Sequence, residues 1–202
     1  TATGGTTGYT YLWNDGQTQA SATGLTAGSY TVTVTDANTC EATATAEITQ
    51  PGSAITASIT SQTNVLCYGT ATGSATVTAS GGTGSYNYLW TTNPVQTTAT
   101  ATGLTAGTYF VVVTDENLCP VTKTVTITQP ESAVTAVITG QTNVLCYGNA
   151  TGSATVTASG GTTAYSYLWN DGQTTATANL LTAGSYTVTV TDANTCEATA
   201  TV

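Results

Sequence analysis

Hydrophobic and polar residues alternate along many short stretches of this chain. Threonine or serine takes every second position, and valine, alanine, isoleucine or tyrosine takes the positions between. Strict alternation over four to eight residues is typical of a half-buried β-strand. No stretch has the spacing of an amphipathic helix. In the middle of the chain, the pattern predicts strands at 54–60, 73–80, 85–90, 97–102, 107–114 and 121–128.

The alternating stretches recur along the chain as a repeat. The passage LTAGSYTVTVTDANTCEATAT occurs at 25–45 and again, unchanged, at 181–201. A diverged copy lies at 104–124. The three tryptophans of the chain recur with a similar period, at spacings of 77 and 79 residues. Repetition at a fixed period indicates a tandem array of one structural unit.

The array divides into one incomplete and two more complete repeats. We expect a partial repeat at 1–51, a complete repeat at 52–130 and a nearly complete repeat at 131–202. The opening strands of the first repeat and the end of the third are missing, so we expect a window of a longer protein. The first two repeats close on a Gln-Pro pair, and proline ends a strand because it has no N–H to donate. The short connections predict neighbouring repeats of fixed relative orientation.

Regular short strands separated by turns of glycine, asparagine and aspartate predict a β-sandwich or barrel. Two details favour immunoglobulin-like sandwiches. Trp90 lies on a middle strand, where such domains bury a tryptophan, and Tyr109 opens a late strand after a tight turn, as in a tyrosine corner. We therefore expect an all-β protein of tandem immunoglobulin-like sandwiches.

The composition excludes several classes of function. The chain has one basic residue, a lysine, and ten acidic residues, which gives a net charge of -9. Binding to nucleic acid or to an anionic membrane surface needs clustered basic residues, so neither is expected. No run of 18 apolar residues is present, so we expect no membrane insertion by this segment. With no histidine in the chain, the usual pairs of nucleophile and base are absent, and we do not expect an enzyme.

The five cysteines occupy two equivalent positions in the repeat. Cys67 and Cys146 precede the second strand, whereas Cys40, Cys119 and Cys196 follow the strongest strand. We expect one disulfide within each complete repeat, Cys67–Cys119 and Cys146–Cys196. The partner of Cys40 would then lie upstream of residue 1, which explains the odd number of cysteines.

The ordered motifs of the repeat resemble a known family. They read CYG-x3-GSATVTASGGT, then Y-x-YLW, then LTAG-x-Y-x-V-x-VTD-x-N-x-C, and close on ITQP. This succession is similar to the SprB-type repeat of very large surface adhesins in gliding and predatory Bacteroidota. The resemblance implies an extracellular β-sandwich at the cell surface, export by the type IX secretion system, and a role in attachment, gliding or cell capture. It supplies no catalytic residue.

The turn before each late cysteine carries an aspartate and an asparagine two positions apart. Oxygen ligands at this spacing can begin a calcium site. The competing interpretation is an Asx-type turn, in which these side chains bond to their own backbone. We favour the turn, because calcium needs six to eight oxygens, and we expect no other cofactor or metal. The calcium candidates are Asp36, Asn38, Asp115, Asn117, Asp192 and Asn194.

Two further groups of side chains are candidates for contacts with partners. Tyr86, Tyr88 and Trp90 lie at strand spacing and suit either a sugar-binding platform or a sandwich core, and we favour the core. Phe110 and Val112 replace threonines of the other repeats on a strand whose alternate residues point inward. They therefore point outward, and we name them as a candidate interface with another chain.

We expect this segment to act as a semi-rigid, disulfide-stabilised spacer of an extracellular adhesin or filament. Its partners would be the neighbouring repeats of its own chain and other copies in a homo-oligomeric filament. The alternative is a multivalent binding module that recognises a glycan, a cell-surface ligand or a neighbouring chain through each repeat.

Overall fold

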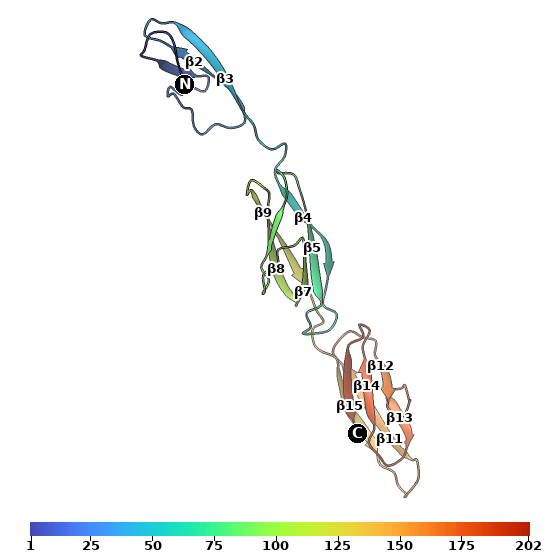
Figure 1. Ribbon diagram of the computed structural model, residues 1–202. Helices are drawn as coiled ribbons and strands as arrows, with labels where there is room; N and C mark the ends of the chain where they lie inside the picture. The colour runs from blue at the N-terminus through green and yellow to red at the C-terminus, as the bar shows by residue number, and fades with distance from the viewer. The chain divides into compact units, whose positions relative to one another are not determined.

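The computed structural model describes residues 1–202 and contains fifteen β-strands and no helix (Figure 1). Every pair of neighbouring strands is antiparallel, as expected for alternating sequences joined by short turns. The structure contains no helix that could span a membrane.

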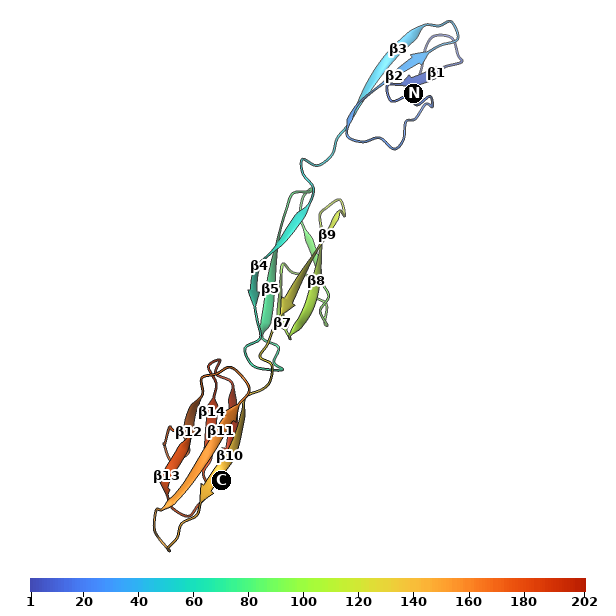
Figure 2. The same cartoon turned by 180° about the vertical axis from the view of Figure 1, so that it is seen from behind.

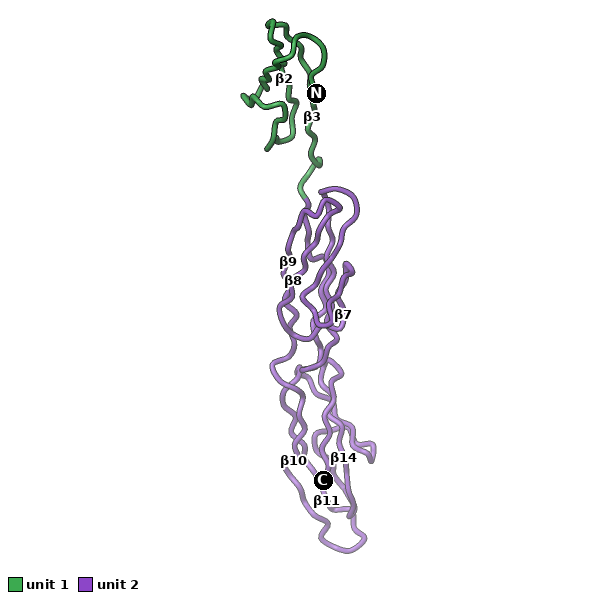
Figure 3. Tube along the Cα trace, turned by 60° about the vertical axis from the view of Figure 1, so that its left-hand side comes forward, with its two compact units in different colours: residues 1–54 green, residues 55–202 purple.

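The chain divides into two compact units, Thr1–Ala54 and Ile55–Val202 (Figure 3). This division keeps the second and third repeats together, and the three repeat boundaries drawn from the sequence stay a prediction. The first unit has a single sheet in which β1 (Thr10–Trp13), β2 (Gly28–Thr35) and β3 (Glu41–Ile48) follow one another. Its one buried hydrophobic side chain is Val32, on the middle strand.

The second unit contains two sandwiches, each built from two three-stranded sheets. In the first sandwich the sheet β4-β5-β7 faces the sheet β6-β8-β9 (Figures 1 and 2). Its strands are β4 (Thr56–Thr63), β5 (Gly73–Ser80), β6 (Asn87–Trp90), β7 (Thr100–Leu104), β8 (Gly107–Thr114) and β9 (Pro120–Ile127). The sequence left this strand order open.

The second sandwich repeats the arrangement, with the sheets β10-β11-β13 and β12-β14-β15. Its strands are β10 (Thr135–Thr142), β11 (Gly152–Ser159), β12 (Ser166–Trp169), β13 (Thr177–Leu181), β14 (Thr187–Thr191) and β15 (Glu197–Thr201). The prediction of an all-β protein with tandem immunoglobulin-like sandwiches is confirmed.

Each sandwich has its own hydrophobic core between its sheets. Strand alternation sends Val111 and Val113 of β8 inward, where both are fully buried. Trp90 is 1% exposed, and its indole Nε1 donates to the carbonyl of Thr98 at 2.9 Å, so the polar group of this large side chain is satisfied. Trp169 lies in the same way in the second core.

The strands found agree with most of those predicted. The predicted ranges 73–80 and 107–114 coincide with β5 and β8. The weakest predicted strand, 97–102, begins later in the structure, as β7 (Thr100–Leu104). The tyrosine expected at the corner bonds back along the chain, because the hydroxyl of Tyr109 donates to the carbonyl of Thr105 at 3.1 Å.

Candidate functional site

The turn before each late cysteine is built around one aspartate. In the first sandwich, Asp115 Oδ1 accepts the backbone N–H of Cys119 at 2.9 Å, and Oδ2 accepts that of Thr83 at 3.0 Å. Leu118, which lies between Asp115 and Cys119 in this turn, has a φ of 61°, a value that residues other than glycine rarely adopt. The carboxylate therefore holds together a tight turn and the neighbouring loop after β5.

The same hydrogen bonds recur in the other two turns. Asp192 accepts from Cys196 at 2.8 Å and from Thr162 at 2.8 Å, and Asp36 accepts from Cys40 at 2.9 Å and from Thr6 at 2.9 Å. The residue before the cysteine again has a positive φ, 66° in one turn and 65° in the other. The three turns thus share one backbone conformation.

These hydrogen bonds lower the pKa of the three aspartates. At Asp36 the N–H of Thr6 contributes most, and at Asp115 the N–H of Cys119 does, because each stabilises the charged carboxylate. At Asp192 the largest single effect is burial, which raises the pKa. The N–H groups of Thr162, Cys196 and Asn194 together outweigh it, so that the pKa is lowered there too.

The calcium candidates lie in these turns, with their carboxylates directed at backbone donors. Asn38 and Asn194 turn their amide nitrogens to the hydroxyls of Thr6 and Thr162, at 2.8 and 3.0 Å. No group of three or more acidic, cysteine or histidine side chains converges in a way that could hold a metal ion. The geometry is that of an Asx-type turn, which is the interpretation that the sequence favoured.

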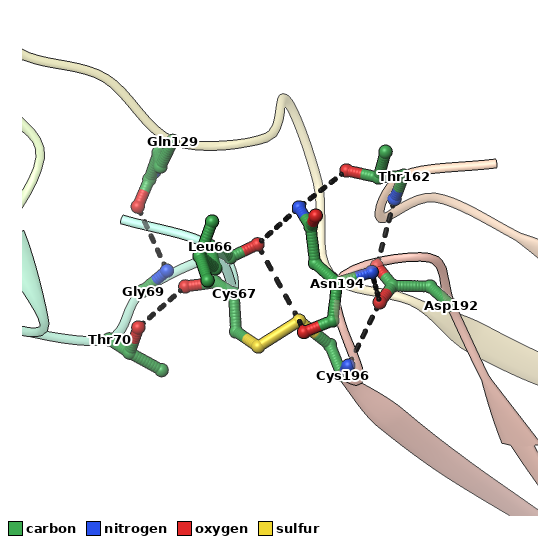
Figure 4. Close-up of a disulfide and its surroundings, with 9 residues drawn as sticks. All are labelled: Leu66, Cys67, Gly69, Thr70, Gln129, Thr162, Asp192, Asn194 and Cys196. Carbon is green, nitrogen blue, oxygen red and sulfur yellow. Dashed lines mark hydrogen bonds between the residues drawn. A yellow bond between two sulfur atoms is a disulfide. The ribbon is translucent and has the colours of Figure 1, made fainter. Parts of the chain in front are cut away.

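The disulfide found in the structure joins two different repeats. Cys67 of the first sandwich is bonded to Cys196 of the second, with a Cα–Cα distance of 5.6 Å and a sequence separation of 129 (Figure 4). Cys40, Cys119 and Cys146 are free and exposed. The predicted pairs Cys67–Cys119 and Cys146–Cys196 are therefore wrong.

The physical reason is the direction of the strands. Cys67 lies in the loop that leads into the start of β5, whereas the turn of Cys119 contacts the loop after its end, where Glu116 N–H donates to the carbonyl of Thr83 at 3.0 Å. An eight-residue strand is about 26 Å long, whereas disulfide-bonded residues have Cα atoms about 4–7 Å apart. The two cysteines of one repeat thus lie at opposite ends of its sandwich.

A hydrogen bond beside the disulfide also joins the turn of Cys196 to the first sandwich. The side-chain amide of Asn194 donates to the carbonyl of Leu66, the residue before Cys67, at 3.1 Å (Figure 4). The same nitrogen donates to Thr162 within its own repeat, so Asn194 is fixed by one repeat while it contacts the other. The sequence suggested Asn194 as a calcium ligand or as part of an Asx-type turn, and it gave no sign of the contact across repeats.

The connecting segment is bonded to the first sandwich. The carbonyl of Thr128 accepts from Val65 N–H at 2.9 Å, and its N–H donates to Asn64 Oδ1 at 3.1 Å. The amide oxygen of Gln129 accepts from Gly69 N–H at 2.9 Å (Figure 4). The glutamine of the closing Gln-Pro pair thus anchors the linker beside the disulfide.

The same segment is bonded to the second sandwich a few residues later. The carbonyl of Ser132 accepts from Gly161 N–H at 2.9 Å, and Val134 is buried in the core. Gly160 passes so close to the linker that a Cβ atom there would lie 2.0 Å from the carbonyl oxygen of Ala133. Only glycine fits at this position, so the Gly-Gly turn of the repeat motif has a direct part in the junction.

We call this set of contacts the junction: the disulfide Cys67–Cys196, the hydrogen bond from Asn194 to Leu66, and the linker 127–134. It fixes two sandwiches to each other by a covalent bond and by backbone hydrogen bonds on both sides. The two sandwiches are thus connected at the junction by one covalent bond and by hydrogen bonds of the linker and of Asn194.

Phe110 and Val112, the interface candidates that the sequence suggested, lie away from the junction on the outer face of the sheet β6-β8-β9. Phe110 is 45% exposed, as predicted, whereas Val112 is half-buried. Val112 pairs with Leu89 of β6, which is 53% exposed, so the outer face of the first sandwich carries three neighbouring apolar side chains.

Comparison with known families gives one result. The model of the SprB repeat matches residues 59–95 and 138–174, which are equivalent parts of the second and third repeats. Comparison with curated proteins gives no match.

Solved structures with some similarity consist of several domains. Three N-terminal domains of the Hoc outer capsid protein of bacteriophage RB49 share 17% identity, with a TM-score of 0.37, over 96% of this chain and 86% of that one. The four N-terminal immunoglobulin domains of Dscam1 isoform 6.44 share 12% identity, with a TM-score of 0.31, over 96% of this chain and 63% of that one. At these values the similarity carries no information about function.

Proposed function

Since residues 59–95 and 138–174 are SprB repeats, we propose that this chain is a segment of an extracellular adhesin or filament, in which it acts as a semi-rigid, disulfide-stabilised spacer. The observation that carries the proposal is the junction. A disulfide and a linker bonded on both sides resist separation and reorientation of the two sandwiches under load.

The burial of the aromatic side chains supports a spacer over a binding platform. Trp90 and Trp169 are each 1% exposed, and Tyr86 and Tyr88 pack against the first core. A sugar-binding platform needs aromatic faces that are open to solvent. In both sandwiches the tryptophan of the stripe is buried in the core, which supports a structural role for the stripe.

The resemblance of the repeat motifs extends the proposal to the parent protein. On this basis the protein lies at the cell surface of a member of the Bacteroidota, is exported by the type IX secretion system, and serves attachment, gliding or cell capture. The disulfide supports an oxidising, extracellular compartment, because structural disulfides are rare where thiols are kept reduced.

The spacer role is tested by residual dipolar couplings of the two sandwiches in the second unit. If the junction is rigid, couplings from β4–β9 and from β10–β15 fit one alignment tensor. The double variant Cys67→Ser/Cys196→Ser is the matched control, and a single alignment tensor should fit the couplings of its two sandwiches less well. Two unrelated tensors in the oxidised wild-type protein would contradict the spacer.

A second candidate function rests on the exposed apolar face of the first sandwich. Leu89, Phe110 and Val112 favour a contact with another chain, as a multivalent binding module would need. Sedimentation equilibrium of the wild type and of Phe110→Thr tests this alternative. Self-association that weakens in the variant would support it, and a monomeric wild type would count against it.

A further inference from the structure

Apart from the linker, the disulfide Cys67–Cys196 is the strongest connection between the two sandwiches of the second unit. The buried residues of the first core lie within 57–127 and those of the second within 134–190, so neither core extends across the junction. Beside the disulfide, the hydrogen bond from Asn194 to the carbonyl of Leu66 joins the sandwiches at 3.1 Å. Opening the disulfide therefore leaves both cores intact and removes most of this direct connection.

The linker has only a short segment that is bonded to neither sandwich. The side chain of Gln129 is bonded to Gly69 of the first sandwich, and the carbonyl of Ser132 to Gly161 of the second, each at 2.9 Å. The two residues between them are proline and glutamate, at 130 and 131. Once the disulfide is open, rotation of one sandwich against the other is concentrated in this two-residue segment.

A hollow beside the disulfide gives solvent access to the bond. Both cysteines are partly exposed, and both line the hollow. Its other lining residues come from both sandwiches and from the end of the linker: Tyr68, Ala133, Val134, Thr195 and Glu197. Exchange of a disulfide requires that a thiolate reach one of the two sulfurs. The hollow allows a small thiol to do so while the protein is folded.

The sulfur of Cys196 has electron-rich surroundings. The carbonyl oxygens of Leu66 and Asn194 lie 3.5 and 3.9 Å from it (Figure 4). The carboxylate of Asp192 accepts the N–H of the same cysteine at 2.8 Å, and Glu197 follows it in the chain. Negative charge on this sulfur is therefore disfavoured, because acceptor oxygens and like charges surround it.

The sulfur of Cys67 lacks charged neighbours in its own loop. Residues 63–72 contain no acidic or basic side chain. In thiol–disulfide exchange the leaving sulfur takes up negative charge, and exchange is faster when it carries that charge easily. Cys67 is thus the better leaving group of the two, and the incoming thiol bonds to Cys196.

We propose that the disulfide Cys67–Cys196 is a redox lock. A small thiol enters the hollow, attacks the sulfur of Cys196 and displaces Cys67, and the junction becomes a hinge at residues 130 and 131. This inference rests on the proposed function of the segment as a semi-rigid spacer, and it adds a way in which the rigid connection is converted into a flexible one without unfolding either sandwich.

The lock opens in two exchange steps. The thiolate of a first small thiol forms a bond to the sulfur of Cys196, the bond between the two cysteines breaks, and Cys67 leaves as a thiolate that takes a proton from water. A second small thiolate then attacks the small-molecule sulfur of the mixed disulfide and releases Cys196 as a thiolate, which is protonated in turn. One protein disulfide is reduced to two thiols, and two small thiols are oxidised to one small disulfide.

The charge at the hollow selects among small thiols. Glu197 lines the hollow, and the carboxylate of Asp192 lies behind the bonded cysteine. The chain as a whole carries a net charge of -9. Such a field attracts cations and repels anions. Thiols with a positively charged group, such as cysteamine, therefore open the lock faster than thiols with a negative one, such as 2-mercaptoethanesulfonate.

The first experiment identifies the sulfur that is attacked. The full-length variant Cys40→Ser/Cys119→Ser/Cys146→Ser, which keeps only the bonded pair, is treated briefly with cysteamine and quenched with acid. After alkylation of free thiols, peptic peptides are analysed by mass spectrometry. We expect the cysteamine adduct on Cys196 and the alkyl group on Cys67. An adduct mainly on Cys67, equal amounts on both, or reduction only at the rate of global unfolding would overturn the proposal.

The second experiment tests the selection by charge. Glu197→Gln should slow reduction by cysteamine about fivefold at low salt, the factor that one charge at close range contributes in water. Reduction by 2-mercaptoethanesulfonate should become faster in the same variant, and 1 M salt should remove both effects. Glu116→Gln is the matched control, because Glu116 lies in the turn at the opposite end of the first sandwich. Unchanged rates in Glu197→Gln would contradict the assigned entry through the hollow.

The third measurement tests the hinge. In the protein reduced by cysteamine, the dipolar couplings within each sandwich should stay as they are, whereas the two sandwiches should need separate alignment tensors. Increased motion in ¹⁵N relaxation should be greatest at Glu131, the residue of the two-residue segment that has an N–H. A single tensor that fits the reduced protein as well as the oxidised one would refute the lock.

Failure of the lock and failure of the spacer are distinguishable. If the oxidised protein fits one tensor and the adduct lies on Cys67, or the reduced protein keeps that tensor, the lock is wrong and the spacer stands. If the oxidised protein already needs two tensors, the spacer is wrong, and with it the conversion from a rigid to a flexible connection, whereas the position of the adduct still tests the attack on Cys196.

Discussion

The disulfide Cys67–Cys196 should limit how far this chain can be stretched. Its two cysteines are 129 residues apart in a chain of 202. A fully extended chain spans about 3.5 Å per residue, so the bond holds back about 450 Å of contour length. With the bond intact, the residues outside the loop extend to only about 250 Å, even after every sandwich has unfolded.

Single-molecule force spectroscopy measures this length directly. The oxidised protein is pulled by its termini, first without and then with a thiol reductant. We expect the reductant to allow one additional release of about 450 Å, because a single bond closes the whole loop. Cys67→Ser should extend fully without reductant, whereas Cys119→Ser should behave as the wild type.

The alternative pairing predicts a different record. Bonds Cys67–Cys119 and Cys146–Cys196 would close loops of 52 and 50 residues. Reduction would then give two separate releases of about 180 Å each. That result would refute the assignment of the bond to the junction, and with it the mechanism proposed for load bearing.

Three other sites in the structure also give testable predictions. Gly160→Ala should loosen the junction, because its Cβ would lie 2.0 Å from the Ala133 carbonyl oxygen. Gly4→Ala is the control, because Gly4 occupies the equivalent position, also has a positive φ and has no neighbour within 4 Å, so this change should leave the junction intact. Dipolar couplings and melting temperatures of the two variants test this difference. Because the pKa of Asp115 in the folded protein lies below its ordinary 3.8, the stability that its carboxylate confers is complete above that pH and is lost as the pH falls through the lowered pKa. The NMR shift of the Cys119 N–H should report this titration, and a midpoint above 3.8 would contradict it. Phe110→Thr should leave the melting temperature nearly unchanged, because the side chain is 45% exposed; a large fall would show that it packs in the fold.

The strands and the core were predictable from the sequence because they depend on local alternation. GTYFVVVT identifies β8 and its inward valines by period alone, and the structure buries Val111 and Val113 as expected. The Asx-type turns were also predictable, since an aspartate bonds to backbone groups within a few residues of itself. The start of β7 was less well predicted, because its alternation is weak and its position depends on pairing with β5.

The junction was not predictable in the same way. The motif of the turn suggests that Asn194 forms hydrogen bonds within it. Its hydrogen bond to the carbonyl of Leu66, 128 residues away, depends on how the two sandwiches meet, which the sequence does not show. The role of Gln129 was likewise hidden, although the closing ITQP motif marked the segment in which it lies.

The sequence by itself determined the repeat, the strand class, the inward side of each strand and the two positions of cysteine. Which cysteines pair was decided only by the tertiary structure. Strand order and direction place Cys67 and Cys119 at opposite ends of one sandwich, and the bonded linker brings Cys67 to the turn of Cys196 in the next. A disulfide needs two Cα atoms within about 7 Å, and separation along the chain says little about that distance.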